Sequence, residues 1–399
     1  MKILIADRLP QSHLDVLASR HQLTLWNPDE TTLIEAVAGQ EALVVRSTKV
    51  TADVIDAATE LALIIRAGAG VNTIDWRSAA NRGVYVCNTP GKNAVAVAEL
   101  TMGLITAIDR RIPDAVTALR SGQWRKKEYA KARGLAGRTL GIIGLGEIGS
   151  EVARRAAAFD MVIATEERPG RTDEQRALID ELDITVMPER FDLLGMSDVV
   201  TLHVPATTET IGMVSGEFLS HMRDGAFLIN TSRGDIIDEE ALLEAIAEKD
   251  LRVGLDVFAN EPAAGTAEFD SPLAKHPHVY ATHHIGASTD QSQDAIADEV
   301  LAIMNDFGRG VIRNCVNLAR EAHGTVVISV RHHNRVGVLA RVLGILRSSG
   351  LNVQHMENRI FDGEQAATAT IHVYGELIDD TVRQVRESLD VFGVSVSGR

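Results

Sequence analysis

Four short apolar runs in the middle of the chain each end in residues suited to proton transfer or anion binding. The runs at 198–203, 226–230, 252–257 and 278–282 end at His203, at the segment Asn230-Thr231-Ser232-Arg233, at Asp256, and at His283 and His284. Histidine titrates near neutrality, and arginine offers a planar two-pronged donor to a carboxylate. Ligands of open α/β sheets bind beyond the carboxyl ends of the strands, so these groups are predicted to face one cleft.

A glycine-rich turn upstream of these runs predicts a dinucleotide site. A buried strand over 140–143 leads into Gly144, Gly146 and Gly149, which fit G-x-G-x-x-G, and a helix follows. These glycines would permit a tight turn, close approach to a pyrophosphate and close helix packing, respectively. Glu166 ends the next strand at the spacing of an acid that binds the ribose hydroxyls. A purely structural glycine turn is the alternative.

Composition narrows the class of protein. Forty basic against 55 acidic residues give a formal net charge of −15, which argues against nucleic acid or an anionic membrane as partner. The two cysteines, Cys87 and Cys315, make neither a disulfide framework nor a metal cluster. With no apolar signal core or membrane-length run, we expect a soluble cytoplasmic protein.

The elements that position these groups alternate between strands and helices. Over residues 1–93, strands are predicted at 2–6, 42–45, 63–66 and 84–87 and helices at 11–20, 31–38, 51–58 and 73–82, which indicates a doubly wound parallel sheet. Polar loops follow two of these strands and contribute candidate ligands for an anionic substrate: Arg46, Ser47, Lys49 and Gly68. A solvated turn is the alternative for the first loop. Asn93 either caps the helix predicted at 94–108 or faces the cleft.

The alternation of strands and helices resumes after a basic segment at 124–133. This segment is either a solvated face or a surface that attracts an anionic substrate or cofactor. Further helices are predicted at 173–182, 215–222, 239–248 and 288–307. We interpret 94–287 as a Rossmann-like domain inserted into a flavodoxin-like lobe made of 1–93 and 288–316. A polar linker at 317–324 then leads to a compact unit at 324–399 with the ferredoxin-like order βαββαβ, suited to regulation or assembly.

Seven stretches carry a resemblance to a known family: RAGAGVNTID (66–75), NTPGKNAVAVAE (88–99), GIIGLGEIG (141–149), HVPATTET (203–210), NTSRGDIIDEEAL (230–242), GLDVFANEP (254–262) and HHIGAST (283–289). The chain resembles the D-isomer-specific 2-hydroxyacid dehydrogenases over about residues 1–315. It is most similar to members that carry a C-terminal ACT domain and oxidise D-3-phosphoglycerate to 3-phosphohydroxypyruvate in serine biosynthesis. The resemblance implies two α/β lobes with a cleft between them.

The resemblance also implies a catalytic set of Arg233, Glu261 and His284. Oxidising a 2-hydroxy acid requires removal of the hydroxyl proton while a hydride leaves C2. His284, selected over His283 by the HIG match, suits the acid/base role, and Glu261 would fix its tautomer. Arg233 would bind the substrate carboxylate and carbonyl oxygen.

NAD is the cofactor that the resemblance implies, and an acid at Glu166 favours it over NADP because a carboxylate repels a 2′-phosphate. Arg168 nearby weakens that preference. The implied cofactor-binding residues are Gly144, Gly146, Glu147, Ile148, Gly149, Glu166, His203, Val204, Pro205, Thr210, Thr231, Ser232, Arg233, Asp256, His284 and Gly286.

Two departures from the family pattern concern ligand recognition. The loop RSTKV at 46–50 is one residue shorter than in many phosphoglycerate-type members, which leaves the identity of the acid open. In the C-terminal unit Val336 replaces a usual proline, while His332, Asn334 and Asn352 occupy the positions that bind serine in regulated members. Serine inhibition is one interpretation, and an ACT unit used only for dimerisation is the other. Family members are homodimers or homotetramers.

Several alternatives stay open at this point. Within the enzyme class, the reaction could be reduction of glyoxylate, hydroxypyruvate or another 2-oxo acid. A different class with this fold comprises dinucleotide-sensing corepressors. Formate dehydrogenases are disfavoured because they have Gln where Glu261 stands. Metal sites at the histidine pairs 276/278, 283/284 and 332/333 are not expected, since no carboxylate or thiolate ligand set accompanies them.

Overall fold

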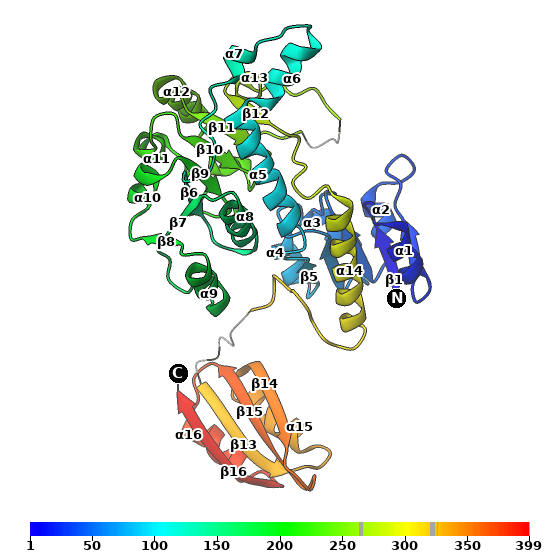
Figure 1. Ribbon diagram of the computed structural model, residues 1–399. Coiled ribbons are helices and arrows are strands. Elements are labelled where there is room, and N and C mark those ends of the chain that lie inside the picture. The colour runs from blue at the N-terminus through cyan, green and yellow to red at the C-terminus, as the bar shows by residue number, and fades with distance from the viewer. Residues whose placement is uncertain (263–265, 320–323, 325, 399) are drawn as a thin grey trace. The chain divides into compact units, whose positions relative to one another are not determined.

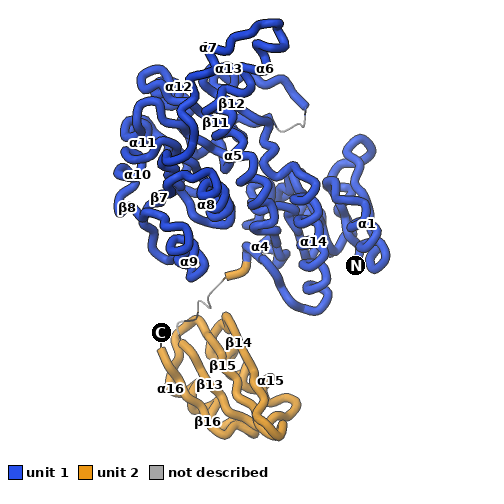
Figure 2. Tube along the Cα trace, in the orientation of Figure 1, with its two compact units in different colours: residues 1–317 blue, residues 318–399 orange. Residues whose placement is uncertain are grey.

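The computed structural model describes residues 1–262, 266–319, 324 and 326–398. The chain forms two compact units, residues 1–317 and 318–399 (Figure 2). The first unit contains two parallel sheets and the second an antiparallel sheet, which confirms the predicted fold class.

The first sheet has five parallel strands in the order β2-β1-β3-β4-β5, the flavodoxin-like order. Apart from the edge strand β2, its strands are short and apolar, as expected for strands buried on both faces. They are β1 (Lys2–Ile5), β2 (Gln22–Leu25), β3 (Ala42–Val45), β4 (Leu63–Arg66) and β5 (Tyr85–Asn88). Sequence patterning missed β2, an edge strand whose side chains are mostly exposed.

Alternate residues of β1, β3 and β4 pack into two cores on opposite faces of this sheet. Leu4, Leu43 and Ile64 pack under one group of helices, whereas Ile3, Val44 and Ile65 pack under another. The first group is α2 (Leu33–Val37), α3 (Ala52–Ala57) and α4 (Trp76–Asn81), and the second is α1 (Gln11–Ala18) and α14 (Asp290–Phe307). Figure 1 shows α14 (yellow) beside this sheet, although it follows the second sheet in the sequence.

The outer edge of β5 is covered by the segment that follows α14. Cys315 pairs antiparallel with Cys87, with backbone hydrogen bonds on either side of the pair. Beyond it, the side-chain amide of Asn317 accepts from Val86 N and donates to Val84 O at 2.9 and 2.8 Å. The edge of the first sheet is therefore covered by a segment that lies more than 200 residues further along the chain.

The second sheet has seven parallel strands in the order β12-β11-β10-β9-β6-β7-β8, which is a Rossmann arrangement extended by one strand. The strands are β6 (Thr139–Ile143), β7 (Val162–Glu166), β8 (Thr185–Met187), β9 (Val199–Leu202), β10 (Phe227–Asn230), β11 (Arg252–Leu255) and β12 (Val279–Ala281). The switch in direction lies between β6 and β9, so the glycine turn after β6 and His203 after β9 come together at one edge.

Helices cover both faces of this sheet (Figure 1). One core forms under α5 (Ala94–Arg110), α8 (Glu147–Ala158) and α9 (Asp173–Glu181), and the other under α10 (Arg190–Met196), α11 (Gly216–His221) and α12 (Glu239–Lys249). Smaller elements are α6 (Ile112–Arg120), α7 (Lys126–Tyr129), the 3-10 turn η1 (Gly234–Ile236) and α13 (Pro272–Lys275). Sequence patterning missed β8, α6, α7, α10 and α13.

The basic segment at 124–133 is a short helix with flanking loops whose arginines are paired. Arg125 contacts Glu128 at 3.3 Å, and Arg133 contacts Asp198 at 2.7 Å. Both arginines therefore form ion pairs within their own domain, which supports the interpretation that they belong to a solvated face and do not attract a ligand.

The second unit has the predicted βαββαβ order and a four-stranded antiparallel sheet, β14-β15-β13-β16. Its elements are β13 (Val326–His333), α15 (Val338–Ser348), β14 (Asn352–Ile360), β15 (Ala366–Tyr374), α16 (Asp379–Arg386) and β16 (Val391–Gly398). Its core joins alternate residues of β13 and β15 to both helices. The predicted linker residues 320–323 lie outside the described part of the chain.

Within the described residues, no helix is long and apolar enough to cross a membrane. The same residues contain no group of three or more histidine, cysteine or acidic side chains placed to hold a metal ion.

Candidate active site

The glycine turn after β6 has the sterics of a dinucleotide-binding turn. Gly144 has a φ of 97°, and a Cβ there would lie 2.5 Å from the carbonyl oxygen of His203. A Cβ on Gly149 would overlap the carbonyl oxygen of Gly144, so this glycine lets α8 pack close to the turn. Nothing lies within 4 Å of a Cβ built on Gly146, the residue that precedes α8. The open space lies where a pyrophosphate would meet the helix N-terminus, so these residues fit a dinucleotide.

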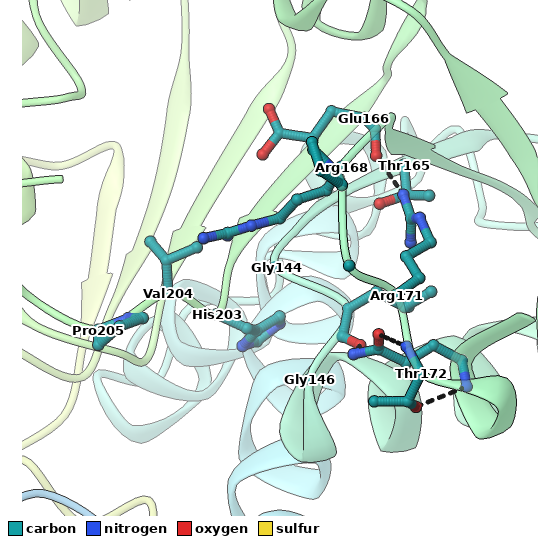
Figure 3. A pocket seen from close by; sticks show the side chains of 14 residues that line it. Gly144, Gly146, Thr165, Glu166, Arg168, Arg171, Thr172, His203, Val204 and Pro205 are labelled. Atoms are coloured by element: carbon teal, nitrogen blue, oxygen red, sulfur yellow. Dashed lines mark hydrogen bonds between the residues drawn. The ribbon is translucent and has the colours of Figure 1, made fainter. Parts of the chain in front are cut away.

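Six of the predicted cofactor residues line one pocket beside this turn (Figure 3). They are Gly144, Gly146, Glu166, His203, Val204 and Pro205. The His203 ring contacts the Thr201 hydroxyl at 2.9 Å, and burial lowers its pKa to about 3. His203 is therefore neutral at physiological pH, and it contributes shape and hydrogen bonding to the pocket wall.

Glu166 lies in this pocket, but its carboxylate is already paired. Arg190, the first residue of α10, binds it in a two-pronged manner, with Nε 2.7 Å from Oε2 and Nη2 3.3 Å from Oε1. Arg171 also donates to the Glu166 carbonyl oxygen. The sequence predicted the position of the acid and missed its partner, which lies 24 residues further along the chain.

The turn after β10 presents Arg233. Asn230 is fully buried; its amide accepts from Ser232 N at 3.0 Å and donates to the Arg233 carbonyl at 2.8 Å. Within the turn, the Thr231 hydroxyl meets the Thr101 hydroxyl of α5 at 2.9 Å. Burial lowers the pKa of Arg233, which Glu261 and Asp235 counteract. The guanidinium thus stands in a shielded place where an anion would be bound strongly.

A histidine–carboxylate pair faces Arg233. Nδ1 of His284 lies 2.7 Å from Oε2 of Glu261, whose other oxygen accepts from Phe258 N at 3.0 Å. Burial alone would raise the pKa of Glu261, but the hydrogen bonds from His284 and Phe258 and the charges of His284 and Arg233 lower it. His284 has a φ of 53°, an unusual backbone conformation for a side chain of its size, of the kind that clusters at functional sites. His283 is outside the pocket that His284 lines.

Asp256 holds the loop that carries His284. It is buried, and its oxygens accept from the Thr282 hydroxyl at 2.6 Å, from Ile285 N at 2.8 Å and from Gly286 N at 2.8 Å. A Cβ on Gly286 would lie 3.0 Å from Asp256 Oδ2, so glycine permits this close approach. The positioning of His284 by Asp256 was not predicted, because Asp256 binds the backbone of residues that lie 29 and 30 positions further along the chain. Contact of Asp256 with the cofactor stays a prediction.

Arg233, Glu261 and His284 line a second pocket together with Arg66, Gly70, Asn72 and Thr73 of the first lobe. Arg66 was missed at the sequence level, although it begins the RAGAG stretch. A Cβ on Gly68 would collide with the Arg66 guanidinium, and one on Gly70 would lie 2.5 Å from Nη2 of Arg233. These glycines therefore leave room for two arginines at one site. Burial and the charges of Arg233 and Arg46 lower the pKa of Arg66 to about 10, opposed by Asp7.

The predicted substrate residues Arg46, Ser47 and Lys49 do not line this pocket. Asp7 holds their loop by accepting from Arg46 N at 2.6 Å, Ser47 N at 3.1 Å and Thr48 N at 3.0 Å. Arg46 Nη1 also donates to Gln293 of α14 at 2.6 Å. Asn93 stands at the N-cap of α5 without a side-chain capping bond. Their roles toward substrate stay predictions.

Eight predicted cofactor residues line neither pocket: Glu147, Ile148, Gly149, Thr210, Thr231, Ser232, Asp256 and Gly286. They lie in the first turn of α8 and in the loops after β9, β10, β11 and β12. Thr210 shapes one of these loops, since its hydroxyl accepts from Thr207 N at 2.8 Å.

The three predicted serine-binding residues do not come together within one C-terminal unit. His332 is buried and meets the Asn358 side chain at 3.1 Å, while Asn334 donates to the Glu364 carbonyl at 2.9 Å. His332 pairs with Ala367 of β15, whereas Asn352 pairs with Tyr374 at the other end of that strand. Asn334 and Asn352 are thus at opposite ends of the sheet.

Comparison with known proteins agrees with this geometry. Residues 102–286 match the D-isomer specific 2-hydroxyacid dehydrogenase, NAD binding domain, and residues 326–388 match the ACT domain. A hydroxypyruvate reductase of Thermotoga maritima is 40% identical over 305 residues, which cover 75% of this chain and 96% of that protein. The chain belongs to the D-isomer specific 2-hydroxyacid dehydrogenase family.

Other family members extend beyond the matched region. A D-3-phosphoglycerate dehydrogenase of Archaeoglobus fulgidus is 38% identical over 80% of this chain and 59% of its own length. One from Mycobacterium tuberculosis is 35% identical over 88% of this chain and 66% of its own length. The chain therefore spans less than two thirds of these two relatives.

Solved structures share the fold of the first unit. A protein of Thermus thermophilus is 31% identical over 79% of this chain and 100% of its own, with a TM-score of 0.70. A D-lactate dehydrogenase of Aquifex aeolicus, complexed with NAD and lactic acid, is 26% identical over 80% of this chain and 100% of its own, with a TM-score of 0.68. The chain is an NAD-dependent dehydrogenase of this family with a C-terminal ACT domain.

Proposed function

We propose that this dehydrogenase oxidises D-3-phosphoglycerate to 3-phosphohydroxypyruvate. The observation that carries the proposal is the presence of two half-buried arginines, Arg66 and Arg233, in the pocket that also holds the His284–Glu261 pair. The mutual repulsion of these cations contributes to the lowered pKa of Arg66. An acid with two anionic ends relieves that repulsion at both residues, whereas a monocarboxylate satisfies one.

In this proposal Arg233 binds the carboxylate and the oxygen on C2, and Arg66 binds the phosphate. Arginine suits both tasks because its planar donors match carboxylate and phosphate oxygens two at a time. Asp7 supports the phosphate end by fixing the 46–48 loop, whose Arg46 carbonyl accepts from Arg66 Nε at 3.1 Å. The pKa of Asp7 is lowered because its hydrogen bonds to Arg46, Ser47 and Thr48 outweigh burial, so it stays ionised near neutrality.

His284 is the proposed base. Glu261 occupies its Nδ1, which leaves Nε2 to accept the proton of the C2 hydroxyl. The carboxylate of Glu261 then stabilises the imidazolium that forms. NAD, when bound, supplies the hydride acceptor. Arg233 stabilises the oxygen on C2 as the carbonyl forms, and in the reverse reaction His284 returns the proton.

We further propose that the domains divide as predicted from the sequence. Residues 1–93 and 288–316 form the substrate lobe, 94–287 the NAD-binding domain and 324–399 the regulatory ACT domain. The common core of α14 with β1, β3 and β4 supports joining the two flanks. The ACT match supports regulation by a small ligand, for which serine is the candidate.

Reduction of hydroxypyruvate is the second candidate. The match to the Thermotoga maritima hydroxypyruvate reductase favours it, since that alignment covers nearly the whole of that protein. In this alternative Arg233 and His284 keep their roles, and Arg66 has no phosphate to bind.

Steady-state assays separate the two candidates. Turnover of D-3-phosphoglycerate with NAD and of phosphohydroxypyruvate, hydroxypyruvate and glyoxylate with NADH should be compared on the full chain. We expect kcat/KM to favour the phosphorylated acids by at least about tenfold, the value of one charge-assisted hydrogen bond. An equal or greater kcat/KM for hydroxypyruvate than for phosphohydroxypyruvate would refute the proposal.

A further inference from the structure

The adenosine end of the cofactor pocket holds an acid whose charge is compensated. Both oxygens of Glu166 face the guanidinium of Arg190, and the Glu166 side chain is only 11% exposed. A free carboxylate at this place rejects a 2′-phosphate by repulsion between like charges. Here Arg190 supplies a positive charge within contact distance, so that repulsion is largely cancelled.

A second arginine in the same pocket is available to a ligand. Arg168 lines the pocket, and its side chain is exposed. Its guanidinium makes no hydrogen bond or ion pair with any residue that the structure describes. In Figure 3 it extends from the segment after β7 across the pocket, while the Glu166 carboxylate points away from the glycine turn. A cation without a partner beside a neutralised acid is a place for an additional anionic group.

Arg171 adds to the positive character of this segment. It lines the pocket and is tied by one guanidinium nitrogen to the Glu166 carbonyl, while its Nε is buried without a hydrogen-bond partner among the described residues. The opposing charge in this segment is Glu167, which does not line the pocket. Arg168 and Arg171 therefore line the pocket beside a carboxylate whose charge Arg190 compensates.

We propose that this pocket accepts a 2′-phosphate as well as a free 2′-hydroxyl, so that the enzyme uses NADP beside NAD. Arg168 binds the phosphate, and Arg190 is the positioning residue that keeps Glu166 turned aside and compensated. The 2-hydroxy acid does not enter this inference, which therefore stands or falls independently of the proposed function.

Binding of the reduced cofactors to the full chain tests the proposal without any substrate. Dissociation constants for NADH and NADPH should be measured by nicotinamide fluorescence, with thermal shifts by 5′-AMP and 2′,5′-ADP as probes of the adenosine end alone. We expect NADPH to bind within about tenfold of NADH, and Arg168→Gln to weaken NADPH by about tenfold or more while changing NADH by less than about twofold.

Two further variants sharpen the result. Arg176→Gln is the matched control, because Arg176 lies in α9, pairs with Asp173 on the surface and does not line the pocket. It should leave both cofactors unchanged. Glu166→Gln removes the remaining negative charge and should strengthen NADPH binding relative to NADH. If NADPH binds more than about a hundredfold more weakly than NADH, or if Arg168→Gln weakens both cofactors equally, the proposal is wrong.

Discussion

Nδ1 of His284 lies 2.7 Å from Oε2 of Glu261, and the two residues come from loops that follow neighbouring strands, β12 and β11. The contact decides which ring nitrogen is free. Because the carboxylate accepts the proton on Nδ1, Nε2 is the nitrogen that can act on substrate.

This contact predicts unequal losses for its two members. His284→Ala should lower kcat by about 10²–10⁴-fold, the usual contribution of a positioned acid/base. Glu261→Gln should cost less, since its amide can still meet Nδ1, although it then favours the tautomer with the proton on Nε2. Steady-state kinetics with NAD and the preferred acid check both. A Glu261→Gln enzyme slower than His284→Ala would contradict the assigned roles.

Asp256 should matter through the loop that it holds. Asp256→Asn replaces an acceptor oxygen with a donor opposite Ile285 N or Gly286 N, so at least one hydrogen bond is lost. A displacement of His284 by about 1 Å can cost on the order of 10² in rate. We expect kcat to fall by roughly that factor, with the thermal midpoint checked in parallel. Unchanged kcat would mean that the loop keeps its place without this carboxylate.

The Arg66 side chain should distinguish phosphorylated from unphosphorylated acids. Arg66→Gln is expected to lower kcat/KM for D-3-phosphoglycerate by about 10–100-fold and for D-glycerate by much less. Arg82→Gln serves as control, since Arg82 belongs to the same lobe and pairs with Asp56 on the surface. Equal losses for the two acids would show that Arg66 does not meet the phosphate.

His203 should make the folded state sensitive to acid. Its folded pKa of about 3 lies below the unfolded value of 6.5, so between these values the unfolded chain binds the proton and the folded chain does not. The free energy of unfolding therefore falls as the pH is lowered from 6.5, by at most about 2 kcal/mol down to pH 5. Urea unfolding at pH 7.5 and pH 5 should show a smaller loss for His203→Gln than for wild type. His221→Gln, at an exposed site in α11, should behave as wild type.

Serine regulation should depend on association of two chains. Asn334 and Asn352 lie at opposite ends of one sheet, so a ligand as small as serine reaches both only between two copies. We expect serine to raise the thermal midpoint and the associated mass together in light scattering, and Asn352→Ala to abolish both effects. A serine response that survives in Asn352→Ala would exclude this site.

The sequence predicted what depends on local pattern. Short apolar strands, the turn at Gly144 and the polar residues at strand ends were all placed close to where they stand, because chain direction alone brings strand ends to one edge. What it missed depends on side chains that meet across the fold. Arg190, at the start of α10, pairs with Glu166 at the end of β7. Asp256, which follows β11, binds the loop that follows β12. The loop that begins at Arg66 was singled out as a ligand-facing strand end, but Arg66 itself was not named, since its place in the pocket depends on the two glycines that follow it. The exposed strand β2 lacked the apolar run that marks the others.

The residues that pair with the outer edge of β5 determine where the chain can be cut to separate the two units. A strand at the margin of a sheet exposes unpaired amides and carbonyls that recruit other chains, and proteins avoid this by covering it. In this chain the cover is Cys315 and Asn317, at the very end of the first unit. A catalytic fragment that stops before Cys315 would retain every residue of both pockets. It would nevertheless expose the unpaired edge of β5, to which other chains could bind. A fragment that continues through Asn317 would keep the edge of β5 paired, so residues 315–317 separate a fragment with a covered sheet edge from one that is prone to aggregate.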